Sequence, residues 1–186
     1  IKKKYDWIIS CVTETSMGFK IPIKELYDLK KKCNSKLFLD ATASIGLENN
    51  HNLGDVVCFS SCKGLFGLTG GAFITFNEKN FNEIDEFNLN ILNHLGKKMT
   101  GPYHAICSLD EILKNYKNFS FSVKINKKKF IRNMKEYLLY PKPNQPNLCT
   151  LISKKVKSDS QNVVLYQSRA NIKGSVVCHL GEVHLK

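Results

Sequence analysis

Three consecutive segments near the start of the chain alternate in a way that restricts the fold. An apolar run at 6–12 indicates a buried strand, Pro22 opens a helix expected from Ile23 to about Cys33, and another apolar run follows at 37–39. The order strand–helix–strand is the unit of a parallel sheet, because parallel neighbours need a long crossover connection. The sequence therefore predicts an α/β fold with a mainly parallel sheet.

The rest of the pattern extends this sheet and adds a smaller second part. Two more strands are expected at 55–59 and 72–76, a polar loop at 13–20, and a helix or loop at 77–95. Helices are expected at 102–116 and 123–139, and after three prolines (Pro141, Pro143, Pro146) short strands are expected at 148–152, 163–166 and 176–180. We therefore expect one α/β domain over 1–120 and a shortened α+β domain over 121–186.

The composition excludes some classes of protein and leaves others open. The chain of 186 residues is 42% hydrophobic and 24% charged, as is ordinary for a globular protein, and no apolar run reaches the roughly 18 residues of a membrane span. Its net charge of +12 raises the possibility of a basic RNA-binding module. However, only Arg132 and Arg169 are arginines, and the lysines are scattered, whereas nucleic-acid surfaces gather basic residues and use arginine. We expect no specific nucleic-acid partner and no membrane partner.

The cysteines and histidines do not form a recognisable metal or disulfide pattern. Seven cysteines are an odd number, no C-x-x-C pair occurs, and the five histidines lack metal-ligand spacing. We expect free thiols in a reducing compartment, the cytoplasm, and no metal. The chain starts without methionine and enters a strand almost at once, so we expect a piece of a longer polypeptide.

One lysine and one aspartate stand out from this background. Lys63 lies in a turn of small residues at 60–67, between two apolar strands, and Asp40 closes the apolar run before it. A lysine of this kind can form a Schiff base with pyridoxal 5'-phosphate, and a strand-end carboxylate can keep the pyridine nitrogen of that cofactor protonated. The alternatives are a surface lysine and an aspartate that caps a turn. We expect Lys63 to be buried.

Several stretches, in this order, resemble the class V group of fold-type I pyridoxal-phosphate aminotransferases, and most resemble its 2-aminoethylphosphonate–pyruvate transaminases. They are Glu14–Gly18 with Ile21–Ile23, Leu39–Gly46, Ser60–Gly64, Met99–His104 and, more weakly, Gly181–Val183. The resemblance covers most of residues 5–118. It implies that the domain over 1–120 is part of the cofactor-binding large domain.

The resemblance also implies a role for particular residues. Lys63 would be the catalytic lysine that holds the cofactor, and Asp40 would pair with the pyridinium nitrogen. Thr15 would contact the ring, Ser60 would donate to the phosphate, and Thr100 would reach the phosphate of a neighbouring subunit's cofactor. A homodimer would follow. The implied reaction moves the amino group of 2-aminoethylphosphonate to pyruvate and gives phosphonoacetaldehyde and alanine.

The sequence departs from the group in three ways, and these keep other functions open. The phosphate-binding loop and the aromatic residue that stacks on the cofactor have no counterpart, and the segment at 129–157 is short. The arginine that would grip the substrate's acid group is missing from Ser175–Leu180, although Arg169 lies nearby. Alternatives are therefore another class V enzyme, of the alanine–glyoxylate or serine type or a lyase, and a catalytically inactive relative.

Overall fold

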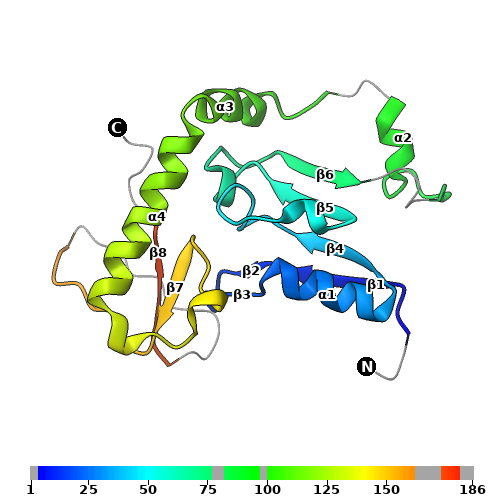
Figure 1. The fold of residues 1–186 in the computed structure, drawn as a ribbon. Coiled ribbons are helices and arrows are strands. Elements are labelled where there is room, and N and C mark those ends of the chain that lie inside the picture. The colour runs from blue at the N-terminus through cyan, green and yellow to red at the C-terminus, as the bar shows by residue number, and fades with distance from the viewer. Residues whose placement is uncertain (1–3, 77–81, 97–99, 162–172, 181–186) are drawn as a thin grey trace.

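A four-stranded, mainly parallel sheet forms the centre of the fold (Figure 1). The computed structural model describes residues 4–76, 82–96, 100–161 and 173–180. Strands β1 (Trp7–Cys11), β4 (Lys36–Asp40) and β5 (Val56–Ser60) run parallel, and β6 (Ala72–Phe76) pairs antiparallel with β5. The order β1-β4-β5-β6 confirms the predicted α/β class.

Helix α1 (Ile23–Cys33) connects β1 to β4 and covers one face of the sheet. Its buried residues Ile23 and Leu26 pack on Leu37 and Leu39, which are fully buried. Burial of each such side chain contributes roughly 1.5–3 kcal/mol. The helix ends at Asn34, whose left-handed backbone (φ 50°) suits a helix C-terminus. The apolar spacing in the sequence therefore located this helix and its buried face correctly.

The opposite face of the sheet is less well covered. Side chains alternate along each strand, so Ile9 and Phe38 project away from α1 and are opposite one another on neighbouring strands. Ile9 is 74% exposed. A cavity of about 450 Å³ lies over this face, lined by Trp7, Ile9, Phe38, Val56, Asn82, Ile84 and Leu89.

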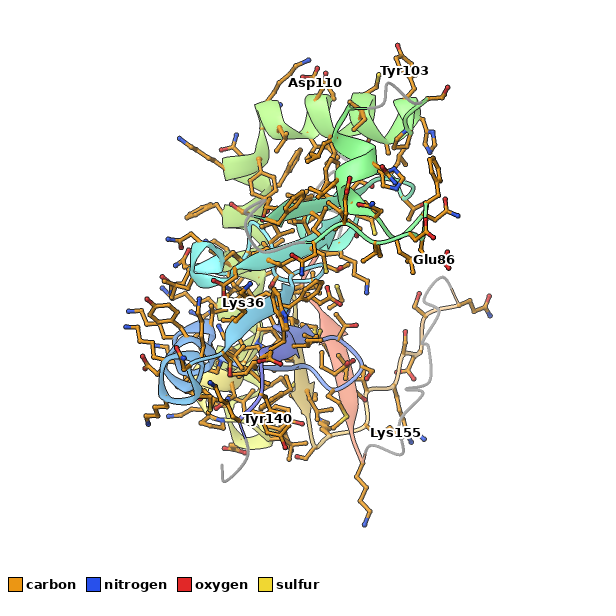
Figure 2. All side chains as sticks on the ribbon, turned by 90° about the vertical axis from the view of Figure 1, so that its right-hand side faces the viewer. Lys36, Glu86, Tyr103, Asp110, Tyr140 and Lys155 are labelled. Atoms are coloured by element: carbon orange, nitrogen blue, oxygen red, sulfur yellow. The ribbon has the colours of Figure 1, made fainter. Side chains whose placement is uncertain are left out.

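The second part of the chain leaves the sheet through helices and ends in a small β-ribbon. Helix α2 (Ile91–Gly96) follows β6, and α3 (Tyr103–Lys114) leads into α4 (Tyr116–Asn133). Figure 1 shows α4 running from α3, above the sheet, down to the antiparallel pair β7 (Cys149–Ile152) and β8 (Ser175–Cys178). Figure 2 shows the same arrangement from the side, with Tyr103 and Asp110 of α3 at the end of the molecule opposite Tyr140.

Two expectations about secondary structure were wrong in detail. The loop at 13–20 contains a short hairpin of β2 (Thr13–Glu14) and β3 (Phe19–Lys20). The second long helix was expected from 123 to 139, but α4 starts at Tyr116, because Tyr116 and Phe119 pack on a core that includes Phe66 and Val123. The strand expected at 163–166 lies outside the described residues.

Among the described residues, no helix has the length and apolar character needed to cross a bilayer.

Candidate functional site

The carboxyl ends of β1, β4 and β5 meet at one edge of the sheet and form the floor of the candidate site. Cys11 lies opposite Asp40, and Asp40 lies opposite Cys58. The ladder continues past the strand ends, since Val12 N donates to Asp40 O (3.0 Å) and Ala41 N donates to Cys58 O (2.8 Å). Alternation along the strands places the three side chains on the face that α1 leaves open. Ligands of open α/β sheets bind at such an edge.

Asp40 is half-buried and is held by the turn that follows β4. Its Oδ1 atom accepts a hydrogen bond from Thr42 N at 2.9 Å. Through this contact Asp40 caps the turn, which is the alternative role that the sequence left open for it. It also fixes the orientation of the carboxylate.

Lys63 begins a 3-10 helix (Lys63–Leu65) just after β5, in an unusual backbone conformation. Its φ angle is 52°, in the left-handed region that residues with side chains rarely adopt. Strained backbone of this kind costs on the order of 1–3 kcal/mol and persists only where the surroundings impose it. The side chain is exposed, so the expected burial of Lys63 was wrong. The turn carries the amine outward, beyond the end of β5.

Neighbouring residues impose this conformation on the turn. Gly64 N donates to Thr42 O (3.3 Å), and a Cβ atom at Gly64 would overlap the carbonyl oxygen of Ile45. The hydroxyl of Tyr116 donates to Gly64 O at 2.7 Å, and burial raises the pKa of Tyr116 to about 12. The Tyr116 ring stacks on Phe66, with 5.6 Å between centroids. Helix α4 therefore holds the Lys63 turn against the turn that follows Asp40.

Electrostatic interactions show that Lys63 and Asp40 act on the same two neighbours. Hydrogen bonds from the hydroxyl and backbone of Ser16 lower the pKa of Glu14, and the charge of Lys63 lowers it further whereas Asp40 opposes this. Desolvation raises the pKa of the Cys11 thiol, Asp40 adds to this effect and Lys63 opposes it. Lys63 and Asp40 are thus among the charges that act on both Cys11 and Glu14, with opposite effects on the pKa. Glu14 was not singled out from the sequence.

The three predicted hydroxyl residues are placed differently. Thr15 is half-buried in the β2–β3 hairpin, and its carbonyl accepts from Gly18 N (3.4 Å). Ser60, half-buried at the end of β5, lies 3.1 Å from Cys62 Sγ through its Oγ. Thr100 is exposed before α3 and, within the described part of the chain, makes no hydrogen bond to the other predicted site residues. Ser60 therefore lies at the same sheet edge as Asp40, and Thr15 lies in the hairpin that follows β1.

A histidine lies in the segment where the resemblance implied an arginine. His179 follows β8, is 3% exposed, and contacts Thr150 Oγ1 through Nε2 at 2.8 Å. Its ring lies 5.3 Å from that of Phe130, and desolvation lowers its pKa to about 4. The imidazole is therefore neutral near pH 7 and presents no positive charge to an acid group. Arg169 lies outside the described residues.

A cavity of about 280 Å³ lies beside the sheet, near the start of α1. Its lining includes Lys20, Ile23, Glu48 and Pro143, but neither Lys63 nor Asp40. Lys20 Nζ pairs with Glu48 Oε2 at 2.6 Å. The described residues also hold no group of three side chains suited to a metal. The cavity over the open face of the sheet is likewise not lined by Lys63 or Asp40.

Comparison with solved structures identifies the fold of which this sheet is a part. An alanine–glyoxylate aminotransferase from Nostoc sp. matches with a TM-score of 0.67 at 17% identity, over 83% of this chain and 47% of that one. A phosphoserine aminotransferase from Cytophaga hutchinsonii matches with a TM-score of 0.64 at 16% identity, over 78% of this chain and 48% of that one. A cysteine desulfurase from Thermococcus onnurineus matches with a TM-score of 0.58 at 16% identity, over 79% of this chain and 44% of that one.

These likenesses show the fold, that of the fold-type I pyridoxal-phosphate transferases. The chain spans about half the length of the structures that it matches. No protein-family model and no curated protein matches the chain.

Proposed function

We propose that this chain is part of a pyridoxal-phosphate-dependent aminotransferase of class V, with Lys63 as the residue that binds the cofactor. The observation that carries the proposal is the hydrogen bond from Gly64 N to Thr42 O (3.3 Å), which joins the Lys63 turn to the turn after Asp40 at the carboxyl edge of a parallel sheet. The proposed cytoplasmic location and the division into domains at residue 120 are kept as predictions.

The side chains at this edge have the chemistry that the cofactor requires. An exposed amine can bond to an aldehyde, and a half-buried carboxylate at a strand end can pair with a cationic ring nitrogen. When bound, pyridoxal phosphate supplies the aldehyde and a ring that accepts electrons from the substrate carbon. The hydroxyls of Thr15 and Ser60, and of Thr100 from a second subunit, would bind its ring and phosphate.

The chain's own residues would then orient the reactants and move protons. Lys63 Nζ would take a proton from the substrate carbon and then donate it to the cofactor. The carboxylate of Asp40, held by Thr42 N at 2.9 Å, would keep the ring nitrogen protonated throughout. The left-handed turn at Lys63 would present the amine above the sheet edge.

For the substrates, we propose 2-aminoethylphosphonate as amino donor and pyruvate as acceptor. The resemblance of Met99–His104 and of the other quoted stretches to that group supports this choice. The alternative is an enzyme of the alanine–glyoxylate or serine type. The match to the alanine–glyoxylate aminotransferase from Nostoc sp. fits both assignments. The missing arginine does not separate them, because alanine, glyoxylate and serine also carry an acid group.

The decisive test is whether the cofactor attaches to Lys63. Purified protein is mixed with pyridoxal phosphate, reduced with borohydride and digested, and the modified peptide is located by mass spectrometry. We expect modification at Lys63, its loss in Lys63→Ala, and its retention in Lys124→Ala, which removes an exposed lysine of α4. Modification spread over many lysines, or kept in Lys63→Ala, would overturn the assignment.

The substrates are ranked in a second step. 2-Aminoethylphosphonate, alanine and serine are added separately, and the loss of the cofactor absorbance is followed. We expect the largest change with 2-aminoethylphosphonate, and a larger change with alanine or serine would support the alternative. A protein that binds the cofactor at Lys63 but responds to no donor would be a catalytically inactive relative.

A further inference from the structure

Two cysteines face each other in the small β-ribbon at the end of the described chain. In the antiparallel pair of β7 and β8, Cys149 is directly opposite Cys178. The next pair outward is Leu148 and His179, and His179 N donates to Leu148 O at 2.8 Å. Hydrogen-bonded and non-hydrogen-bonded pairs alternate along an antiparallel ladder, so Cys149 and Cys178 form a non-hydrogen-bonded pair.

This position brings the two cysteines close enough to bond. Opposite Cα atoms in non-hydrogen-bonded pairs lie about 4.5 Å apart, and disulfides span Cα separations of about 4.4–6.8 Å. By contrast, Cys11 and Cys58 are separated by β4, which places them about two strand spacings, roughly 9–10 Å, from each other. Among the described strand pairings, no other pair of cysteines is in direct opposition.

Cys149 also contacts the hairpin that carries Thr15. Its Sγ donates to Thr15 O at 3.8 Å. Beside this contact, Gly18 lies so close to Leu151 N that a Cβ atom at Gly18 would collide with it, and Gly18 has a φ of 55°. The β2–β3 hairpin is therefore packed directly on β7.

We propose that Cys149 and Cys178 form a reversible disulfide, and that its formation releases the hairpin at Thr15 from β7. All seven cysteines are free in the structure. To bond with Cys178, Cys149 Sγ gives up its hydrogen and turns away from Thr15 O. The carbonyl of Thr15 then loses one of its two donors, and Gly18 N remains.

The chemistry requires an oxidant, for which a low-molecular-weight disulfide is sufficient. Cys178 is exposed, so its thiolate attacks the small disulfide, forms a mixed disulfide and releases one small thiol. Cys149 then loses its proton, attacks the Cys178 sulfur and releases the second small thiol. Two protein thiols are oxidised and one small disulfide is reduced. Burial raises the pKa of Cys149 to about 12, so little of its thiolate is present at neutral pH.

The test uses oxidised glutathione and needs no cofactor. The purified chain is incubated with this reagent, alkylated and digested without reduction, and linked peptides are identified by mass spectrometry. We expect a peptide pair joined through Cys149 and Cys178, which dithiothreitol separates. The link should be absent in Cys178→Ser and present in Cys107→Ser, which removes another exposed thiol. A stable mixed disulfide on Cys178, or bridges distributed over other cysteines, would overturn the proposal.

The release of the hairpin has its own measurement. Amide hydrogen exchange of residues 15–20 is compared before and after oxidation, and we expect exchange to be faster by roughly fivefold in the oxidised chain. In Cys178→Ser the same treatment should leave these rates unchanged. Equal rates in the reduced and the bridged wild-type chain would overturn the coupling to Thr15. An influence on cofactor binding would rest on the proposed function, whereas neither the disulfide mapping nor the hydrogen exchange depends on it.

Discussion

The hydroxyl of Tyr116 donates a hydrogen bond to the carbonyl oxygen of Gly64, across 52 residues of sequence. This contact joins the first turn of α4 to the turn that contains Lys63. The same ring blocks any side chain at Gly46 and stacks on Phe66. Because Gly64 also bonds to Thr42, the contact stabilises the arrangement that places Lys63 next to the end of β4.

Removing the hydroxyl of Tyr116 should therefore destabilise the fold while leaving the aromatic packing in place. We expect Tyr116→Phe to lower the free energy of unfolding by about 1–2 kcal/mol, because Gly64 O loses its donor in a half-buried place. Urea denaturation measures the change. Tyr103→Phe is the matched control, because Tyr103 is 80% exposed and its loss of a hydroxyl should have little effect. Equal effects of the two substitutions would contradict this role of Tyr116.

Gly64 is required by close packing, and alanine there should be costly. The new methyl group would overlap Ile45 O, so the Lys63 turn or the turn after Asp40 must shift. We expect Gly64→Ala to lower the free energy of unfolding by about 1–3 kcal/mol. Gly101→Ala is the control, because nothing lies within 4 Å of a Cβ atom at Gly101. If both variants unfold at the same denaturant concentration, the packing argument is wrong.

Local patterns were sufficient to locate the sheet and its first helix. The apolar runs before Asp40 and after Gly71 predicted β4 and β6, and the spacing of Ile23 and Leu26 predicted α1 with its buried face. The positions of these elements are determined by side chains that are close in sequence. Strand-end positions also showed that Asp40 would lie at the carboxyl edge of the sheet.

The contacts that shape the candidate site depend on residues far apart in sequence, and no local pattern contains them. The early start of α4 depends on Phe66 and Tyr116, and the Lys63 turn depends on the same tyrosine. Glu14 was part of a quoted motif, but the effect of Lys63 on its pKa joins residues that are far apart in sequence and depends on the folded chain. The exposure of Lys63 likewise follows from its left-handed backbone, which the residue type does not predict.

The charge of Asp40 can be separated from its structural role. Asp40→Asn keeps an Oδ1 acceptor for Thr42 N but removes the negative charge. We expect the stability to change by less than about 0.5 kcal/mol, since the turn is preserved. On the proposed function, the affinity for pyridoxal phosphate should fall about tenfold or more, because a hydrogen bond to a charged group is lost. Absorbance titration with the cofactor measures this.

The control for that substitution is Asp28→Asn, on the exposed side of α1, which should leave cofactor affinity unchanged. If Asp40→Asn binds the cofactor as tightly as the wild type does, Asp40 has only the turn-capping role. If Asp40→Asn unfolds more readily by several kcal/mol, its effect on binding is indirect.

His179 should make the stability of the fold depend on pH. Desolvation lowers its pKa from 6.5 to about 4 in the folded chain, so between these values the unfolded chain binds the extra proton. The stabilisation is complete above about pH 6.5 and is lost as the pH falls towards 4. On this basis the free energy of unfolding should be about 2 kcal/mol lower at pH 5 than at pH 7.

Urea denaturation of the wild type and of His179→Gln at the two pH values isolates this contribution. The variant loses the ring contact with Phe130 and is less stable at pH 7, but its additional loss at pH 5 should be smaller by about 2 kcal/mol. Part of the pH dependence remains in it, because burial also lowers the pKa of His51. His94→Gln, which replaces an exposed histidine, should keep the wild-type difference. An unchanged pH dependence in His179→Gln would mean that folding does not change the pKa of His179, and that burial does not hold its imidazole neutral.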